Sequence, residues 1–187
     1  MRVRALFAAG LAALAAAAAT PQQIADGINS ITHKMAALQA PGQSITIVNA
    51  PLIVIGQGPF PTIIAGFNDI VSTATVLAGQ IGSRPERRAT DAGQEGGVAV
   101  ADAYRTLTRV SQATLNILIG KAGLLQHVPV VGPPVASVLR GVEATFDSIA
   151  IGLINTFPSE AKELESNANS LGATLDLAIQ KYEGLQV

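Results

Sequence analysis

The sequence contains no cysteine and no tryptophan, and it has only two tyrosines and five phenylalanines among 187 residues. Without cysteine the chain cannot form disulfides or use a thiol nucleophile. Without tryptophan, and with few other rings, it offers little of the aromatic platform that usually holds a sugar in a glycosidase. Hydrophobic residues nevertheless make up 49% of the chain. The fold must therefore be stabilised by burying Ala, Val, Ile and Leu side chains.

Charged residues are also scarce, at 13% of the chain, with 12 Lys and Arg against 13 Asp and Glu. Two of the basic residues, Arg2 and Arg4, belong to an N-terminal leader. Without them 10 basic residues face 13 acidic ones, which gives a net charge of −3. A protein of that charge has no electrostatic attraction for nucleic acid or for anionic lipid. Nucleic acid is therefore not an expected partner.

The first 19 residues have the pattern of a secretory signal peptide. Arg2 and Arg4 precede an alanine-rich apolar run, and cleavage is expected between Ala16 and Thr20. The run is too short and too rich in alanine for a transmembrane anchor, which needs about 20 strongly apolar residues. The C-terminal KYEGLQV has no hydrophobic tail for lipid-anchor attachment. We therefore expect one mature domain, residues 20–187, without a transmembrane segment. The protein is expected to be secreted and extracellular, and its association with the cell wall is an open alternative.

Regularly spaced aliphatic residues predict about five amphipathic helices. Thr20 and Pro21 suit an N-cap and a first helical position, and apolar residues then recur at alternating steps of four and three. Four prolines and three glycines make residues 41–61 irregular. The predicted fold class is an all-α, single-domain bundle with this Pro/Gly-rich segment between the first two helices. The helices are expected near residues 20–40, 62–82, 98–121, 134–157 and 158–185.

The end of the fourth predicted helix is unusual because it is apolar nearly all round. In IAIGLINTF, Ile151 and Ile154 occupy the helix face that is polar two turns earlier. Two arrangements are possible: burial under the segment Ser44–Pro61, or an exposed apolar tip. Burial is favoured because monomeric proteins rarely expose large contiguous apolar patches.

Motifs for catalysis and metal binding are missing from the sequence. There is no G-x-S-x-G elbow and no H-E-x-x-H, and the two histidines, His33 and His127, are isolated. The run LIVIGQGPFP lacks the third glycine of a dinucleotide-binding turn, and Pro59 and Pro61 remove amide donors that would bind phosphate. We therefore nominate no catalytic residue, metal site or cofactor, and we expect the protein not to be an enzyme.

Three stretches carry a family resemblance: IADGINSITHKMAALQ, PVVGPPVASVLRGVEATFDSIAIGLI and FPSEAKELESNANSLGATLDLAIQKY. In this order they resemble the fungal hydrophobic surface-binding protein A family, also described as cell wall galactomannoproteins. The resemblance covers nearly the whole mature chain. It implies a small secreted helical protein that adsorbs to hydrophobic surfaces, with a fatty acid enclosed in some members and esterases recruited by others. The chain departs from the family pattern at Ser44–Pro61 and lacks the Ser/Thr-rich tail of wall-bound members.

Two interpretations of the aliphatic helix faces follow. In the first, the faces accept a fatty-acid-like long-chain lipid between the helices or pack onto a hydrophobic surface. In the second, they fill a dry core, and the protein is a structural cell-wall or surface coat without a ligand pocket. For the first interpretation Tyr104 is the polar group expected to meet a carboxylate. The candidate contact residues are Phe67, Ile70, Tyr104, Leu118, Val142, Phe146 and Ile149.

Overall fold

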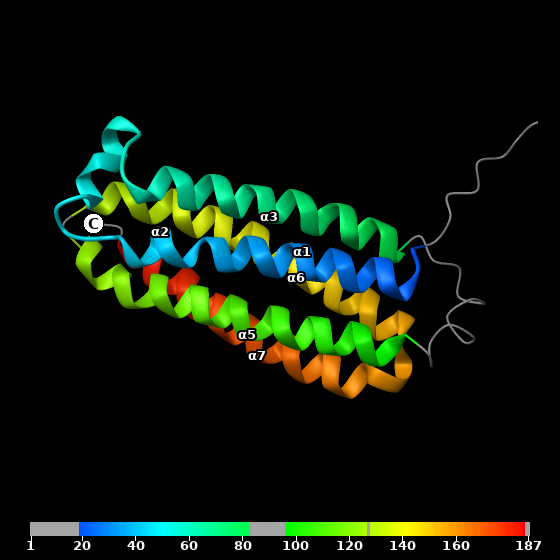
Figure 1. Ribbon diagram of the computed structural model, residues 1–187. Coiled ribbons are helices and arrows are strands. Elements are labelled where there is room, and N and C mark those ends of the chain that lie inside the picture. Colours follow the sequence, from blue (N-terminus) through cyan, green and yellow to red (C-terminus); the bar gives the residue numbers. More distant parts are fainter. Residues whose placement is uncertain (1–18, 83–95, 127, 186–187) are drawn as a thin grey trace, which may run out of the picture.

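Helices dominate the computed structural model, which describes residues 19–82, 96–126 and 128–185 (Figure 1). The α-helices in these ranges are α1 Pro21–Ala37, α2 Gln39–Gln43, α3 Pro59–Gly82, α5 Gly97–Ala122, α6 Gly132–Thr156 and α7 Ala161–Glu183. Short 3-10 turns join them: η1 Ala50–Ile55, η2 Gly123–Leu125, η3 Pro129–Val131 and η4 Pro158–Glu160. The described residues include no strand, and the predicted all-α bundle is confirmed.

The first helix begins where the sequence predicts it. The Thr20 hydroxyl accepts a hydrogen bond from the Gln23 amide (3.2 Å), and the Gln23 side chain accepts one from the Thr20 amide (2.8 Å). Pro21 occupies the first helical position. This reciprocal capping satisfies two amides that a helix start otherwise leaves unpaired. The predicted stripe of α1 is buried throughout: Ile24, Ile28, Ile31, Met35 and Leu38.

Five long helices form a closed ring. Each packs against two others, in the order α1, α5, α7, α6, α3 and back to α1, while the short α2 packs on α5 and α3. α1, α5 and α7 run in one direction along the bundle, and α3 and α6 run in the opposite direction (Figure 1). Every member of such a ring turns one apolar face toward a shared core. Although α5 follows α3 in the chain, α3 and α5 are not neighbours in the ring.

The Pro/Gly-rich segment between the first two long helices contains more regular structure than its composition predicts. It holds α2 and η1, and α3 starts at Pro59 rather than at residue 62. Pro59 and Pro61 are compatible with this start because amides in the first turn have no partner within the helix. Gly56 and Gly58 have φ values of 72° and 82°, a left-handed conformation that favours glycine, and they form the turn before α3.

The core consists of the helix faces that the spacing predicts. On α3, for example, Ile63, Phe67 and Ile70 are fully buried. Aliphatic side chains supply most of this core, as the composition requires. The rings are few but all lie inside, and each aromatic side chain in the described ranges is at most 3% exposed: Phe60, Phe67, Tyr104, Phe146, Phe157 and Tyr182.

The predicted burial of the apolar end of α6 under Ser44–Pro61 is wrong. Ile151 is 61% exposed, and Ile154 is partly buried against the core. The neighbouring Gly152 faces Ile81, near the end of α3, and this end of the bundle is opposite to the segment Ser44–Pro61 (Figure 1). The physical reason is length, because a helix of 25 residues spans roughly 37 Å. The end of α6 is therefore a full bundle length away from the segment that was expected to cover it.

Two of the sequence predictions fall on residues outside the described ranges. The signal peptide, residues 1–19, is described only at Ala19, and His127 is not described. Secretion and the division into leader and mature domain stay predictions. His33, by contrast, is described, and it lies exposed on α1 as its position off the apolar stripe predicts.

Candidate functional site in the bundle interior

The seven predicted contact residues all lie in the core of the ring. They come from three helices and are at most 3% exposed, and they belong to one hydrophobic cluster. The structure therefore brings these residues into one interior, although their contact with a ligand stays a prediction. They are Phe67 and Ile70 on α3, Tyr104 and Leu118 on α5, and Val142, Phe146 and Ile149 on α6.

Tyr104, the predicted polar group, is 1% exposed. Burial, and next to it the charge of Asp147, raise the pKa of its phenol well above the ordinary value. The phenol is therefore neutral at physiological pH and can act as a hydrogen-bond donor. The proximity of Asp147 disfavours a second carboxylate beside the same phenol, because like charges repel.

Two buried hydroxyls on α5 are polar groups that sequence analysis missed. Thr108 and Ser111 are 3% and 0% exposed, and neither side-chain oxygen has a hydrogen-bond partner among the residues that the structure describes. Leaving a buried hydroxyl unpaired costs about 1–3 kcal/mol, so such groups are rare in folded proteins. Two of them within one turn of one helix indicate a place where a polar group from outside the described chain can bind.

Other buried hydroxyls of the core show the usual arrangement. The Thr114 hydroxyl is placed to donate to the backbone oxygens of Met35 and Val110, both at 3.0 Å. The phenol of Tyr182 donates to the backbone oxygen of Leu118 at 3.1 Å. These side chains tie α5 to α1 and to α7 and are explained by packing. The unpaired pair on α5 is therefore an exception within its own core.

A signal for Ser111 was present in the sequence. The apolar stripe of α5 runs through Tyr104, Leu107, Thr114 and Leu118, and the position between Leu107 and Thr114 at the same spacing is Ser111. Ser111 is seven residues from both Tyr104 and Leu118, which places it on their face of the helix. A serine at the centre of an apolar stripe indicates a polar group that the helix buries.

The seam between α1 and α3 is the least extensive of the five helix contacts in the ring. The Lys34 ammonium pairs across it with the Asp69 carboxylate (2.7 Å) and donates to the Thr73 hydroxyl (2.8 Å). Beside this ion pair, Leu77 packs so closely over Gly27 that a Cβ there would lie 2.8 Å from it. A groove with a volume of about 340 Å³ is open to solvent along the same seam.

The helix α3 is the most hydrophobic wall of the ring. Its 24 residues include one charged side chain, Asp69. The helix α3 is long and apolar enough to cross a membrane, but the core helix of a helical bundle can have the same length and composition. In the structure its face of Ile63, Phe67 and Ile70 is buried in the ring.

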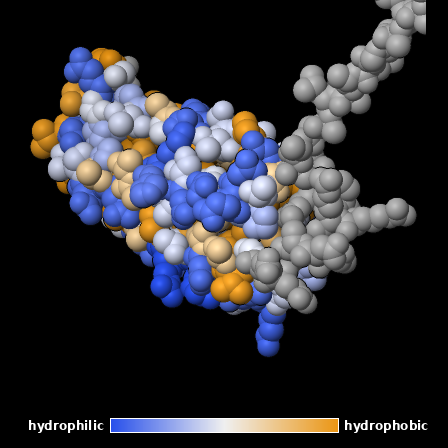
Figure 2. Space-filling view, turned by 45° about the vertical axis from the view of Figure 1, so that its right-hand side comes forward, coloured by the Kyte–Doolittle hydropathy of each residue, from blue (hydrophilic) through white to orange (hydrophobic). Residues whose placement is uncertain are grey.

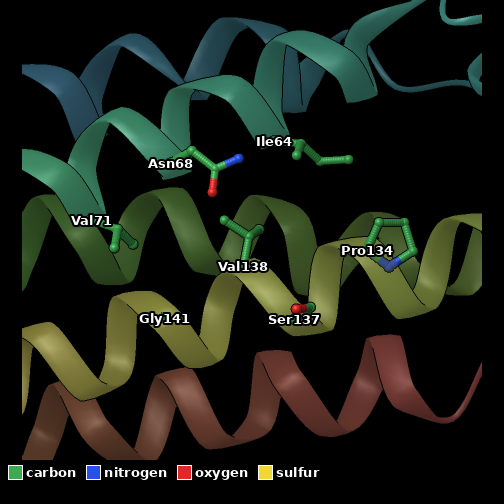
Figure 3. Close-up of a pocket in the computed structure, with 7 residues that line it drawn as sticks. All are labelled: Ile64, Asn68, Val71, Pro134, Ser137, Val138 and Gly141. Carbon is green, nitrogen blue, oxygen red and sulfur yellow. The ribbon is translucent and has the colours of Figure 1, made fainter.

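A second groove lies between α3 and α6 (Figure 3). Its volume is about 320 Å³, and it is open to solvent rather than enclosed. Ile64 and Val71 face Val138 across it, with Asn68 and Ser137 as polar side chains. A shallow open groove of this kind can accept part of an apolar chain but does not remove it from water. A third open groove, of about 460 Å³, lies between the ends of α5 and α7.

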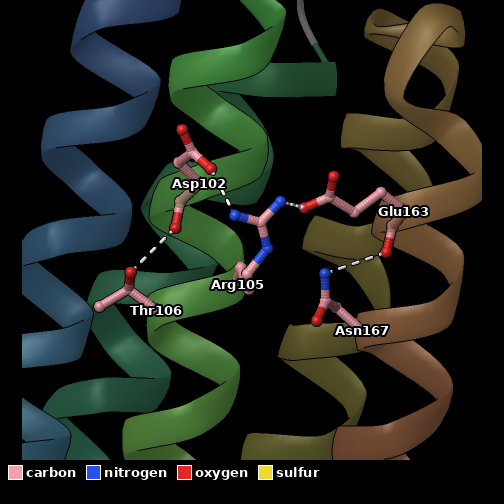
Figure 4. A network of polar contacts seen from close by, with 5 residues as sticks. All are labelled: Asp102, Arg105, Thr106, Glu163 and Asn167. Carbon is pink, nitrogen blue, oxygen red and sulfur yellow. Dashed lines mark hydrogen bonds and ion pairs between the residues drawn. The ribbon is translucent and has the colours of Figure 1, made fainter.

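The charged side chains near the starts of α5 and α7 form a structural network (Figure 4). Arg105 pairs with Asp102 one turn earlier (2.6 Å) and with Glu163 on α7. The Thr106 hydroxyl and the Asn167 side chain complete it through the backbone oxygens of Asp102 and Glu163. Within the described ranges no group of three or more His, Cys, Asp and Glu side chains is placed to hold a metal ion.

Comparison with known proteins shows the fold of this chain. No family profile and no curated protein matches it. Its structure is similar to the crystal structure of Afmp4p in complex with palmitic acid, with a TM-score of 0.72 and 15% identity over 87% of this chain and 99% of the other. It is also similar to ligand binding domain 2 of the Penicillium marneffei MP1 protein complexed with multiple arachidonic acids, with a TM-score of 0.67 and 14% identity over 87% and 94%. Membership of the family named from the sequence stays a prediction.

Proposed function

We propose that the protein is secreted and binds a long-chain fatty acid inside its five-helix ring, without catalysing a reaction. The observation that carries this function is the pair of unpaired, buried hydroxyls of Thr108 and Ser111 in an otherwise aliphatic core. A carboxylate accepts hydrogen bonds from hydroxyls, and its acyl chain gains free energy by leaving water. The two structures of the same fold contain palmitic and arachidonic acid, which supports this class of ligand.

The acyl chain would lie along the predicted contact residues. Phe67 and Ile70 on α3 and Phe146 on α6 belong to walls of the ring on the side away from α5. The carboxylate would bind at Ser111, and the chain would extend from there between the aliphatic faces. The α1–α3 seam is the proposed way in, because opening it breaks the ion pair of Lys34 with Asp69 and separates the smallest helix contact of the ring.

Replacement of Ser111 by alanine tests this function. We expect Ser111→Ala to weaken the binding of palmitic acid about tenfold or more, because a hydrogen bond to a charged group contributes roughly 1.5–3 kcal/mol. The same change should leave the stability of the ligand-free protein unchanged or raise it, because it removes an unpaired buried hydroxyl. Native mass spectrometry with added palmitic acid measures the first effect, and urea unfolding measures the second.

Ser148→Ala is the matched control. Ser148 is exposed on α6, and its hydroxyl donates to the Ala144 backbone oxygen. We expect this variant to bind palmitic acid like the unchanged protein. Equal binding by the Ser111 and Ser148 variants would show that the buried hydroxyl does not hold the ligand. Absence of lipid from protein collected from culture medium, together with no uptake of palmitic acid at micromolar concentration, would rule out the function itself.

A surface coat without a ligand is the second candidate function. The observation that favours it is the near-complete burial of all seven predicted contact residues, which is what a filled core requires. It predicts concentration-dependent adsorption to hydrophobic beads and no bound lipid in native mass spectra. Recruitment of a secreted esterase, as the family resemblance implies, stays an additional proposal. Co-sedimentation of a secreted esterase with protein-coated beads, compared with bare beads, would test it.

A further inference from the structure

Two segments without charge meet at one end of the bundle. Asp, Glu, Lys and Arg are absent from the sequence between Lys34 and Asp69 and again between Lys121 and Arg140. These stretches include η1 and the connection from α5 to α6, which lie at the same end of the ring (Figure 1). We name the described residues 44–58, 123–126 and 128–131 the uncharged end.

Aliphatic side chains extend into solvent at the uncharged end. Of the nine large hydrophobic side chains that are exposed in the described ranges, five belong to it, and Val48 reaches 87% exposure. Figure 2 shows hydrophobic side chains protruding at this end beside hydrophilic ones. More than half of the exposed large hydrophobic side chains of the described ranges therefore lie at this one end of the bundle. The five are Ile47, Val48, Leu52, Ile55 and Val130.

Polar groups of the same end are paired within the fold. The Asn49 side chain donates to the Ser44 backbone oxygen (2.7 Å) and accepts from the Thr46 amide (2.8 Å). The Lys121 ammonium donates to the Ile45 backbone oxygen (2.9 Å) from the end of α5. Backbone groups that are already paired lose little when water is removed, which is the condition for contact with an apolar phase. Asn49 and Lys121 are thus paired within the fold, while Ser44 and Thr46 are exposed beside the protruding aliphatics.

We propose that the uncharged end docks on an electrically neutral lipid surface, with Ile47, Val48 and Ile55 inserted among the acyl chains. Its segments contain no Lys or Arg to attract anionic headgroups; beside them, Lys121 donates to the Ile45 backbone oxygen, and Lys181 of α7 lines a groove with Gln126. Their aliphatics protrude singly, which suits a fluid phase that closes around them, whereas a protein partner would need a matching pocket for each. This proposal rests on the proposed function only for the class of partner, which is lipid. The residues of the interior site are not part of the docking surface.

Flotation with phosphatidylcholine vesicles tests the docking surface. Ile47→Asp and Ile151→Asp are a matched pair, because the two isoleucines are 63% and 61% exposed. Val130→Asp and Val76→Asp are a second pair, at 59% and 60%. We expect the changes at the uncharged end, Ile47→Asp and Val130→Asp, to reduce vesicle binding about tenfold, because a carboxylate is costly to bring into an apolar phase. The variants at Ile151 and Val76 should stay within about twofold of the unchanged protein.

Salt and lipid charge give the second measurement. Binding should be the same with phosphatidylcholine and with mixtures that contain phosphatidylglycerol, and it should persist from low to 0.5 M salt, because no ion pairs are involved. Docking as proposed is overturned if the unchanged protein does not bind neutral vesicles, if it needs anionic lipid, or if both members of a matched pair lose binding equally. The two proposals can fail separately. Ile47→Asp should still take up palmitic acid in solution, and the unchanged protein should bind vesicles even if it takes up no palmitic acid.

Discussion

The uncharged end and the opposite end of the bundle are formed by the same ring of helices but carry different side chains. At the opposite end, Arg105 connects α5 to α7 through Glu163 and pairs with Asp102 (Figure 4). At the uncharged end, the chain pairs its own backbone groups and exposes aliphatics such as Val48. The contrast is one of degree: Ile151 is exposed at the opposite end, and at the uncharged end the helices bring Lys121 to Ile45 and Lys181 to the groove beside Gln126.

The residues that stabilise the fold are therefore different from the exposed residues that can contact a partner. The helix stripes are continuous from one end to the other, so the core does not distinguish the ends. The distinction comes from the exposed positions of the connections, because their buried positions, such as Ile45, Ala50, Leu125 and Val131, belong to the core. In the proposed docking, one end of the ring would contact lipid and the other would stay in water, although the same helices form both ends.

The largest expected effect is on packing at the uncharged end. Gly132 starts α6 there, and a Cβ at this position would lie 2.4 Å from the Tyr182 backbone oxygen. Gly132→Ala should destabilise the protein by about 1–3 kcal/mol, because backbone must move to make room. Gly172→Ala is the control: nothing lies within 4 Å of its Cβ, and alanine should stabilise α7 by up to about 1 kcal/mol. Urea unfolding that gives both variants the same free energy would contradict this packing.

A smaller effect is expected at the charged end. Arg105→Met should lower the free energy of unfolding by roughly 0.5–1 kcal/mol at low salt, because partly exposed ion pairs contribute about this much. The loss should shrink in 0.5 M salt, which screens the pairs in the unchanged protein. Arg109→Met, one turn later on the exposed side of α5, should have little effect. A loss that does not depend on salt would assign the role of Arg105 to packing of its aliphatic stem.

The smallest effect concerns the seam between α6 and α7, which links the two ends. Partial burial, and then the hydrogen bond and charge of Asp176, raise the pKa of Glu143. A carboxyl whose pKa is raised by folding contributes stability at low pH and loses it as the pH rises through the raised pKa. Glu143→Gln should therefore be more stable than the unchanged protein at pH 7, by about 0.2–0.5 kcal/mol after solvent screening.

Thermal unfolding at pH 7 and pH 4 measures the effect of Glu143. The advantage of Glu143→Gln should be present at pH 7 and disappear at pH 4, where the carboxyl of the unchanged protein is protonated. Glu165→Gln is a suitable control because Glu165 is exposed on α7. An equal gain at both pH values would show that charge repulsion at the seam is not the cause.

Much of the fold could be predicted from local patterns. The α1 start at Thr20 and Pro21 depends on adjacent residues, and the buried stripes depend on spacing within a helix. The contact residues Phe67 and Phe146 could be placed in the core for the same reason. The exposure of Ile151 could not be predicted, because it depends on which end of the bundle each connection occupies. The importance of Ser111 was hidden because an unpaired hydroxyl is recognised only when its neighbours in space are known.

The sequence by itself determined that the chain is helical, aliphatic and free of cysteine, because composition and spacing act over a few residues. Only the tertiary structure decided that the helices close into a ring, that Thr108 and Ser111 meet no partner among the described residues, and that Val48 and Val130 share one end. These features depend on contacts between residues far apart in the chain. Helix periodicity states which face is buried, but not which other helix covers it.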